Sequence, residues 1–185
     1  MTVADHSSQV NASILTKGGT VVPNQIVALY FDNHRDNIIW FWSVIAAGAV
    51  PAVLQPFSNN LKTMADQVAN IDRILQSPTV ITSQHLALNF KPMPSIKTIT
   101  IQRIHFDDNA RKVSMEPQCL ASSELASIYF TSGSTGHSKA VEFSHNQLIS
   151  SVEAKTRFHG TKSDWNFLTW CCMYYDICHS LTRNC

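Results

Sequence analysis

The sequence predicts an α/β fold in which a mainly parallel sheet is flanked by helices. Two observations lead to this fold class. Short, continuous apolar runs of strand length recur from about residue 24 onward, and segments with a helical period lie between them. Short links join the two kinds of segment, as in α/β domains with a parallel sheet.

The strands follow from the apolar runs. The first twenty residues are polar and predict a frayed helix with a turn near Gly19. The runs after them predict three neighbouring strands at Ile26–Phe31, Val50–Leu54 and Thr79–Thr82. Residues 90–122 are less regular, although Lys97–Ile101 has the composition of a further strand.

Two helices are expected between these strands. Asp32 and Asn33 are favourable N-cap residues for a strongly apolar helix that runs from His34 to Gly48. A second helix is predicted from Leu61 to about Gln76, because its apolar residues keep a helical period. Both helices fit the strand–helix–strand order of a parallel sheet.

Composition limits the classes of function. The chain has 185 residues, 44% hydrophobic and 15% charged, which is typical of one folded domain. Its net charge of +1 is scattered, so a nucleic-acid or anionic-membrane surface is not expected. No apolar window reaches the roughly 18 residues of a membrane span, and the start lacks a signal-peptide layout. We therefore expect a cytoplasmic location.

The five cysteines do not form a metal-binding pattern. Cys119 stands alone, while Cys171, Cys172, Cys178 and Cys185 gather near His179 at the end of the sequence. Structural zinc sites usually pair their cysteines at Cys-x2–4-Cys spacing, which the adjacent Cys171-Cys172 does not match. Reduced thiols without a metal are expected.

The strongest functional signal is the segment Thr131-Ser-Gly-Ser-Thr-Gly-His-Ser-Lys139, which follows a predicted strand at Leu125–Phe130. Glycines let the main chain approach a ligand, hydroxyls and backbone N–H groups donate hydrogen bonds, and Lys139 adds a positive charge. The candidate phosphate-binding residues are Thr131, Ser132, Gly133, Ser134, Thr135, Gly136 and Lys139.

An ordinary Ser/Thr/Gly-rich surface loop is the alternative interpretation of this segment. It is also not a Walker A loop, because the G-x-x-x-x-G-K-[ST] spacing is absent. After it, Ala140–Phe143 predicts a strand, and Ser144 is a plausible N-cap for a helix from His145 to about Phe158.

The order and the identity of the residues in this segment together resemble a known family motif. Residues 131–141 resemble the signature loop of the adenylate-forming (AMP-binding) superfamily, close to [ST]-S-G-[ST]-T-G-x-P-K-G-V. Ser138 and Ala140 depart from that pattern, and both departures resemble the adenylation domains of fungal non-ribosomal peptide synthetase-like proteins. The segments Tyr30–Trp42 and Val44–Ala52 resemble other motifs of that group. The resemblance covers roughly residues 20–170.

The resemblance implies an ATP-dependent ligase that activates a carboxylic acid as its adenylate. It implies ATP with Mg²⁺, a carboxylic acid substrate and, in a full-length protein, a carrier domain as partner. Residues 131–136 and Lys139 would then hold the phosphates. No residue of this chain is assigned as catalytic or as a metal ligand, because the adenine-reading loop, the ribose-binding aspartate and the lid lysine belong to later parts of the family pattern.

The expected organisation is a partial adenylation domain at residues 1–170, the N-terminal subdomain of such an enzyme, followed by a divergent tail at residues 171–185. Two hypotheses about function remain open. The chain is the N-terminal piece of an adenylating ligase that is inactive by itself, or it is a non-catalytic fragment or interaction protein that keeps an adenylation-type fold.

Overall fold

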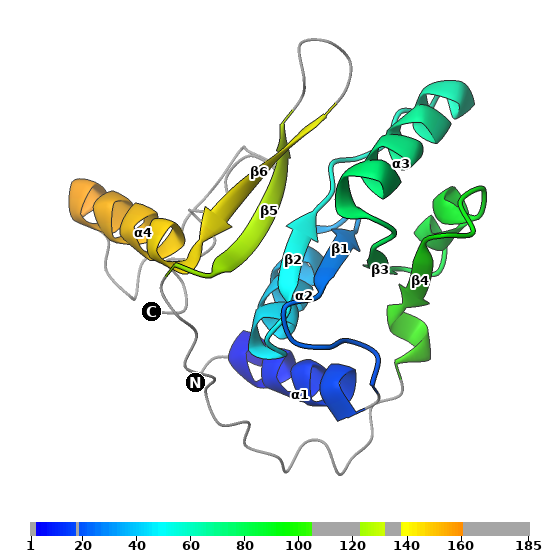
Figure 1. Ribbon diagram of the computed structural model, residues 1–185. Coiled ribbons are helices and arrows are strands. Elements are labelled where there is room, and N and C mark those ends of the chain that lie inside the picture. The colour runs from blue at the N-terminus through cyan, green and yellow to red at the C-terminus, as the bar shows by residue number, and fades with distance from the viewer. Residues whose placement is uncertain (1–2, 18, 105–122, 132–137, 161–185) are drawn as a thin grey trace.

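The computed structural model describes residues 3–17, 19–104, 123–131 and 138–160. Its strands form one six-stranded sheet with the order β4-β3-β1-β2-β5-β6 (Figure 1). The bounds are β1 (Ile26–Tyr30), β2 (Val50–Val53), β3 (Thr79–Thr82), β4 (Lys97–Thr100), β5 (Leu125–Thr131) and β6 (Lys139–Ser144). Strands β1 to β5 pair in parallel, and β6 pairs antiparallel with β5. The predicted mainly parallel α/β sheet is therefore confirmed, including β3, β1 and β2 as neighbours.

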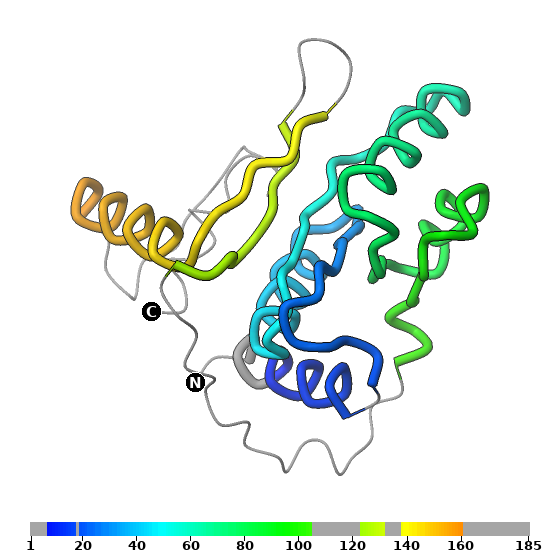
Figure 2. Tube along the Cα trace, viewed as in Figure 1, coloured from blue at the N-terminus to red at the C-terminus, as the bar shows by residue number. Residues whose placement is uncertain are grey.

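The described residues form four α-helices around this sheet: α1 (Val3–Lys17), α2 (His34–Ala46), α3 (Leu61–Leu75) and α4 (His145–His159). Two short 3-10 helices, Leu86–Phe90 and Ile101–Arg103, flank β4 in the sequence. The trace in Figure 2 shows α1 beside α2, with α3 on the other side of the strands and α4 next to the β5–β6 pair. None of the helices in the described ranges is long and apolar enough to cross a membrane.

Alternating side chains of β1 explain why helices cover both faces of the sheet. Val27 and Leu29 pack in one apolar cluster with residues of α1 and α2. Ala28 and Tyr30 pack in a second cluster with residues of α3. Successive residues of a strand point to opposite faces, so a strand that is apolar throughout must be covered twice. Strand β1 is the centre of this three-layer arrangement.

Most helix ends follow the capping residues in the sequence. Asn33 caps α2 by accepting a 2.8 Å hydrogen bond from the backbone N–H of Asp36. Asn60 caps α3 in the same way through the N–H groups of Lys62 and Thr63. Gly48, beyond the end of α2, has φ +75°, a backbone conformation that glycine adopts without strain.

The N-terminal helix differs from its prediction. The polar composition of the first residues predicted a frayed helix, whereas α1 packs firmly against α2. Leu15 is 1% exposed and Ala12 is fully buried. Ser8 is also buried and donates its hydroxyl to the carbonyl of Ile39, over 3.2 Å. Small side chains let the two helices approach closely, and burial of one leucine stabilises a fold by about 1.5–3 kcal/mol.

Strands β5 and β6 form the hairpin that follows the parallel strands. The antiparallel pairing places Thr131 opposite Lys139 and Phe130 opposite Ala140. Helix α4 begins directly after β6, where Ser144 forms a capping box with Gln147. The predicted strand and helix are confirmed here. Residues 132–137, Cys119 and the predicted tail at 171–185 lie outside the described residues.

Candidate phosphate-binding site

The candidate site lies at the edge of the sheet where the parallel strands end. Thr131 is the last residue of β5, Gln55 follows β2, and Asp32 follows β1. In open parallel α/β sheets, ligands bind outside the carboxyl ends of the strands. The structure therefore places the start of the predicted phosphate-binding segment at the sheet edge where this rule expects a ligand.

The two ends of the candidate segment are brought together. Thr131 and Lys139 are opposite each other in the β5–β6 ladder, and both are exposed. The Thr131 hydroxyl lies 3.5 Å from the carbonyl oxygen of Lys139, to which it donates. Of the other predicted site residues, Ser132, Gly133, Ser134, Thr135 and Gly136 lie outside the described residues. One hydroxyl donor and one cation are thus on neighbouring positions at the same edge.

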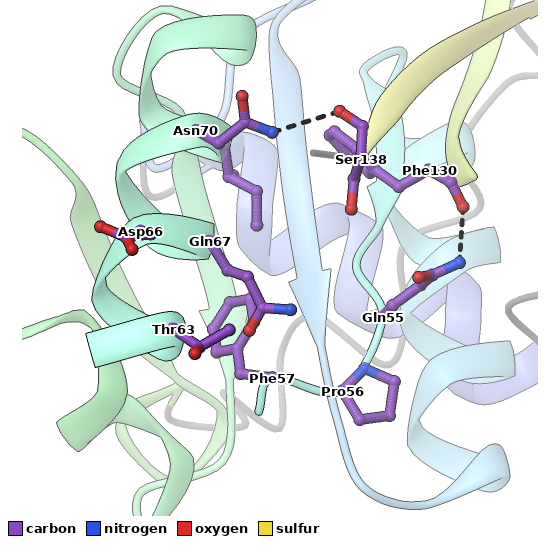
Figure 3. A pocket seen from close by; sticks show the side chains of 10 residues that line it. Gln55, Pro56, Phe57, Thr63, Asp66, Gln67, Asn70, Phe130 and Ser138 are labelled. Atoms are coloured by element: carbon purple, nitrogen blue, oxygen red, sulfur yellow. Dashed lines mark hydrogen bonds between the residues drawn. The ribbon is translucent and has the colours of Figure 1, made fainter. Parts of the chain in front are cut away.

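A pocket of about 210 Å³ opens beside the C-terminal end of the segment (Figure 3). Helix α3 forms one wall, and the residues just after β2 form another. The lining residues are Gln55, Pro56, Phe57, Thr63, Asp66, Gln67, Asn70, Ile71, Phe130 and Ser138. Pockets for drug-sized ligands span about 300–1,000 Å³, so this pocket has room for only part of a nucleotide.

Backbone carbonyls on both sides of the segment accept hydrogen bonds from amide side chains. Gln55 Nε2 donates to the Phe130 carbonyl over 2.7 Å, and Asn70 Nδ2 donates to the Ser138 carbonyl over 3.2 Å (Figure 3). The sequence analysis did not identify Gln55 or Asn70. Gln55 could have been found from its position directly after a buried strand, whereas Asn70 has no comparable signal within α3.

Phe57, which lines this pocket, belongs to a cluster of aromatic rings. Phe57 stacks on Tyr30 with ring centroids 4.4 Å apart, and the Phe57 backbone N–H donates to the Tyr30 hydroxyl over 3.3 Å. Phe90 meets both rings edge-on. Such aromatic pairs contribute about 0.5–1.5 kcal/mol beyond their buried area. The segment after β2, which carries Gln55, is therefore held firmly.

A second pocket, of about 200 Å³, lies where β1 leads into α2, and Asp32 is among its lining residues. Asp32 Oδ2 lies 2.9 Å from Nε2 of His85, and His85 Nδ1 lies 3.1 Å from the Ser83 hydroxyl. The hydrogen bond with His85 is the largest cause that holds the pKa of Asp32 below its usual range. This pair joins the ends of β1 and β3.

The described residues do not contain a site that fits a resident metal ion. Within residues 3–17, 19–104, 123–131 and 138–160, no group of three or more His, Cys, Asp or Glu side chains could hold one. Among the described residues, Asp66 is the only carboxylate in the lining of the pocket beside Ser138. No Mg²⁺ ligand is therefore assigned in this part of the chain.

Comparison with known proteins indicates the same family as the sequence motif. The family profile described as "AMP-binding enzyme" matches residues 2–184. Nonribosomal peptide synthetase acyN of Ascocoryne sarcoides is 36% identical over 173 residues. That alignment covers 92% of this chain and 19% of acyN, so the chain spans about a fifth of the curated relative.

Solved structures share the fold. The fatty acid AMP ligase from Legionella pneumophila superposes with a TM-score of 0.81 at 20% identity, over 97% of this chain and 31% of that one. The McyG A-PCP structure, which holds phenylalanyl-adenylate, gives a TM-score of 0.74 at 18% identity, over 92% of this chain and 32% of that one. At these identities the likeness shows the fold alone.

Proposed function

This chain belongs to the AMP-binding enzyme family and is related to fungal nonribosomal peptide synthetases, and from this premise we propose that it supplies the phosphate-binding part of a ligase that activates carboxylic acids with ATP. The observation that carries the proposal is the pairing of Thr131 with Lys139 at the carboxyl edge of the parallel sheet. A hydroxyl and an ammonium group at one place suit a polyphosphate.

In the proposed reaction a carboxylate oxygen bonds to the α-phosphorus of ATP. The bond from that phosphorus to the oxygen bridging the α- and β-phosphates breaks, and pyrophosphate leaves. Negative charge collects on the phosphate oxygens, where Lys139 and donors of residues 132–136 would stabilise it, together with the Thr131 hydroxyl once it turns from the Lys139 carbonyl to the phosphate. Mg²⁺ accompanies ATP in this proposal and would neutralise part of the same charge.

The partners follow from the same proposal. Acyl adenylates imply a carboxylic acid as second substrate, and the adenylation–carrier composition of the McyG structure supports a carrier domain as acceptor in a full-length protein. Since ATP is a substrate, we place the activity in the cytoplasm. We also propose that the 185 residues by themselves do not turn over. The non-catalytic alternative, in which the chain acts only as an interaction module, predicts no dependence of any activity on Lys139.

The direct test is ATP binding by the purified chain. Lys139→Ala should weaken ATP binding by about tenfold, because a charge-assisted contact to phosphate is lost. Lys97→Ala is the matched control: it removes an exposed lysine from β4, at the opposite edge of the sheet. Equilibrium dialysis with ATP and MgCl₂ provides the dissociation constants. Equal affinities for wild type and Lys139→Ala would refute the phosphate role of Lys139.

A further inference from the structure

At each end of the candidate segment, a backbone carbonyl accepts a hydrogen bond from an amide side chain that is distant in the sequence. The Phe130 carbonyl, which accepts from Gln55, belongs to the peptide that leads into Thr131. The Ser138 carbonyl, which accepts from Asn70, belongs to the peptide that leads into Lys139. We refer to these two hydrogen bonds as the amide tethers. They act on the peptides directly before the two described site residues.

The orientation of the Asn70 amide is fixed by a neighbouring cation. Arg73 Nη2 donates to Asn70 Oδ1 over 2.9 Å, on the same helix. An amide oxygen occupied by a guanidinium leaves the amide N–H₂ group to point the other way, toward Ser138. Asn70 is only 8% exposed, so a lost partner there is not readily replaced by water.

Helix α3, which carries Asn70, is held in place by its own packing and by its N-cap. Val68, Ile71 and Leu75 on the same helix are each at most 5% exposed and belong to the apolar cluster beneath β1 and β2. The Asn60 cap fixes the start of the helix. A side chain on a packed helix is positioned more accurately than one on a loop.

The other tether has an equally firm base in the sheet. Leu54, directly before Gln55, is fully buried, and its N–H donates to the Leu29 carbonyl over 2.9 Å. The stacked Phe57 holds the chain on the other side of Gln55. The two tethers thus come from different elements, α3 and the end of β2, and reach the β5–β6 hairpin at two points.

We propose that Gln55 and Asn70 are positioning residues that hold the peptides before Thr131 and Lys139 in place for phosphate binding. This inference rests on the proposed function. Neither amide contacts the phosphates in this scheme. Their effect is to reduce the freedom that Thr131 and Lys139 would lose when a ligand binds, and such preorganisation raises affinity.

The first experiment needs no ligand. Amide hydrogen exchange is measured at Thr131, Lys139 and Ala140 in the 185-residue chain and in Asn70→Ala, Asn70→Asp and Gln55→Ala. Asn70→Asp keeps an oxygen for Arg73 and replaces the N–H₂ donor by a charged carboxylate oxygen, which cannot donate to the Ser138 carbonyl. We expect exchange about three- to tenfold faster at Lys139 and Ala140 for both Asn70 variants, and at Thr131 for Gln55→Ala, from the loss of one hydrogen bond. Exchange in β1 and β3 should not change.

Gln67→Ala is the matched control. Gln67 is also an amide on α3 and lines the same pocket, but its side-chain oxygen accepts from the Ser58 N–H over 2.8 Å, on the segment after β2. It should leave exchange at Lys139 unchanged. Unchanged exchange at the hairpin in all three tether variants, or equal acceleration in Gln67→Ala, would overturn the proposal.

The second experiment links the tethers to the ligand. ATP with MgCl₂ is titrated into wild type, Asn70→Ala, Lys139→Ala and the double variant. We expect Asn70→Ala to weaken binding by about three- to tenfold. The double variant should bind ATP at most about twofold more weakly than Lys139→Ala does, because Asn70 acts through Lys139. Fully additive losses would overturn this role of Asn70. Absence of ATP binding in wild type would instead refute the proposed function, while hydrogen exchange still decides on the tethers.

Discussion

Asp32 lies just beyond β1, at the edge of the sheet that also holds Thr131, and its carboxylate pairs with His85. Both side chains are more than half exposed, at 55% and 64%. Exposed pairs of this kind contribute about 0.2–1 kcal/mol, so the pair is a local link between the ends of β1 and β3 and contributes little to total stability.

A pH dependence follows from this pair. The hydrogen bond from His85 lowers the pKa of Asp32 from its ordinary value of 3.8. A carboxyl with a depressed pKa stabilises the fold above that ordinary value, and the stabilisation is lost as pH falls through the folded pKa. His85→Ala should therefore raise the pKa of Asp32 toward 3.8 and should destabilise the chain at pH 6 more than at pH 3.

Carbon-detected NMR titration of the Asp32 carboxyl measures the pKa directly, and urea unfolding at the two pH values measures the stability difference. Asp32→Asn combined with His85→Ala is the control, since the second change should have little further effect once the carboxylate is gone. An Asp32 pKa that is identical in wild type and His85→Ala would contradict the assignment of His85 as the main cause.

At the scale of residues, the sequence predicts the site residues that belong to one short segment. It does not predict the residues that reach this segment from distant elements. Thr131 and Lys139 could be chosen because their segment has a characteristic order of glycines, hydroxyls and a lysine. Gln55 and Asn70 could not, because their partners lie 75 and 68 positions away in the sequence. The contacts of the two amides arise only when β2, α3 and the hairpin come together.

At the scale of elements, helix α4 begins with a reciprocal cap. The Ser144 hydroxyl accepts from the Gln147 N–H over 3.3 Å, and the Gln147 side-chain oxygen accepts from the Ser144 N–H over 2.8 Å. The cap also fixes the direction in which the chain leaves β6. Because β6 starts at Lys139, this junction sets the far end of the strand that carries the site.

Removing the cap should be measurable. Ser144→Ala should lower the free energy of unfolding by about 1 kcal/mol, because the Gln147 N–H loses its acceptor. Ser150→Ala makes the same chemical change at an exposed position within α4 and should be neutral or slightly stabilising, since alanine has the higher helix propensity. Urea unfolding followed by circular dichroism compares the two. A loss of the same size in both variants would mean that the capping box does not stabilise this helix.

The element boundaries were more predictable than the packing of α1. Caps and apolar periods placed β1 to β3, α2 and α3 within one or two residues of their observed ends. The helix predicted in the polar first twenty residues is present, but it packs against α2 instead of fraying. Among the described side chains of α1, six are buried and three of these are polar: Ser8, Val10, Asn11, Ala12, Ser13 and Leu15. Close helix contact, not hydrophobicity alone, buries this face.

At the scale of the whole molecule, the chain spans 19% of acyN and about a third of the solved relatives. For the 185 residues assayed by themselves we expect no carboxylate-dependent exchange of pyrophosphate into ATP, whatever acid is offered. Positioning of both substrates and stabilisation of the transition state require groups that the family pattern carries in later segments. Lys139→Ala should then lower ATP binding and leave the exchange rate at background.

Radiolabelled pyrophosphate exchange, with an empty-vector preparation as reference, measures this. Exchange clearly above that reference, and abolished by Lys139→Ala, would show that these residues are sufficient for adenylation. Background exchange combined with ATP binding that depends on Lys139 is the expected outcome. Background exchange without any ATP binding would favour the interaction-module alternative.

The strand order also has a consequence for the chain as it leaves the ribosome. Strands β1 to β4 and helices α1 to α3 are complete by residue 100, and their parallel strands pair with one another. The partner of β2 on its other side is β5, which begins at Leu125. Synthesis runs at about 5–20 residues per second, so the edge of β2 lacks its neighbour for a few seconds in each nascent chain. An apolar strand with an open edge can pair with other chains. During translation, the β5–β6 hairpin therefore also serves to close an aggregation-prone edge.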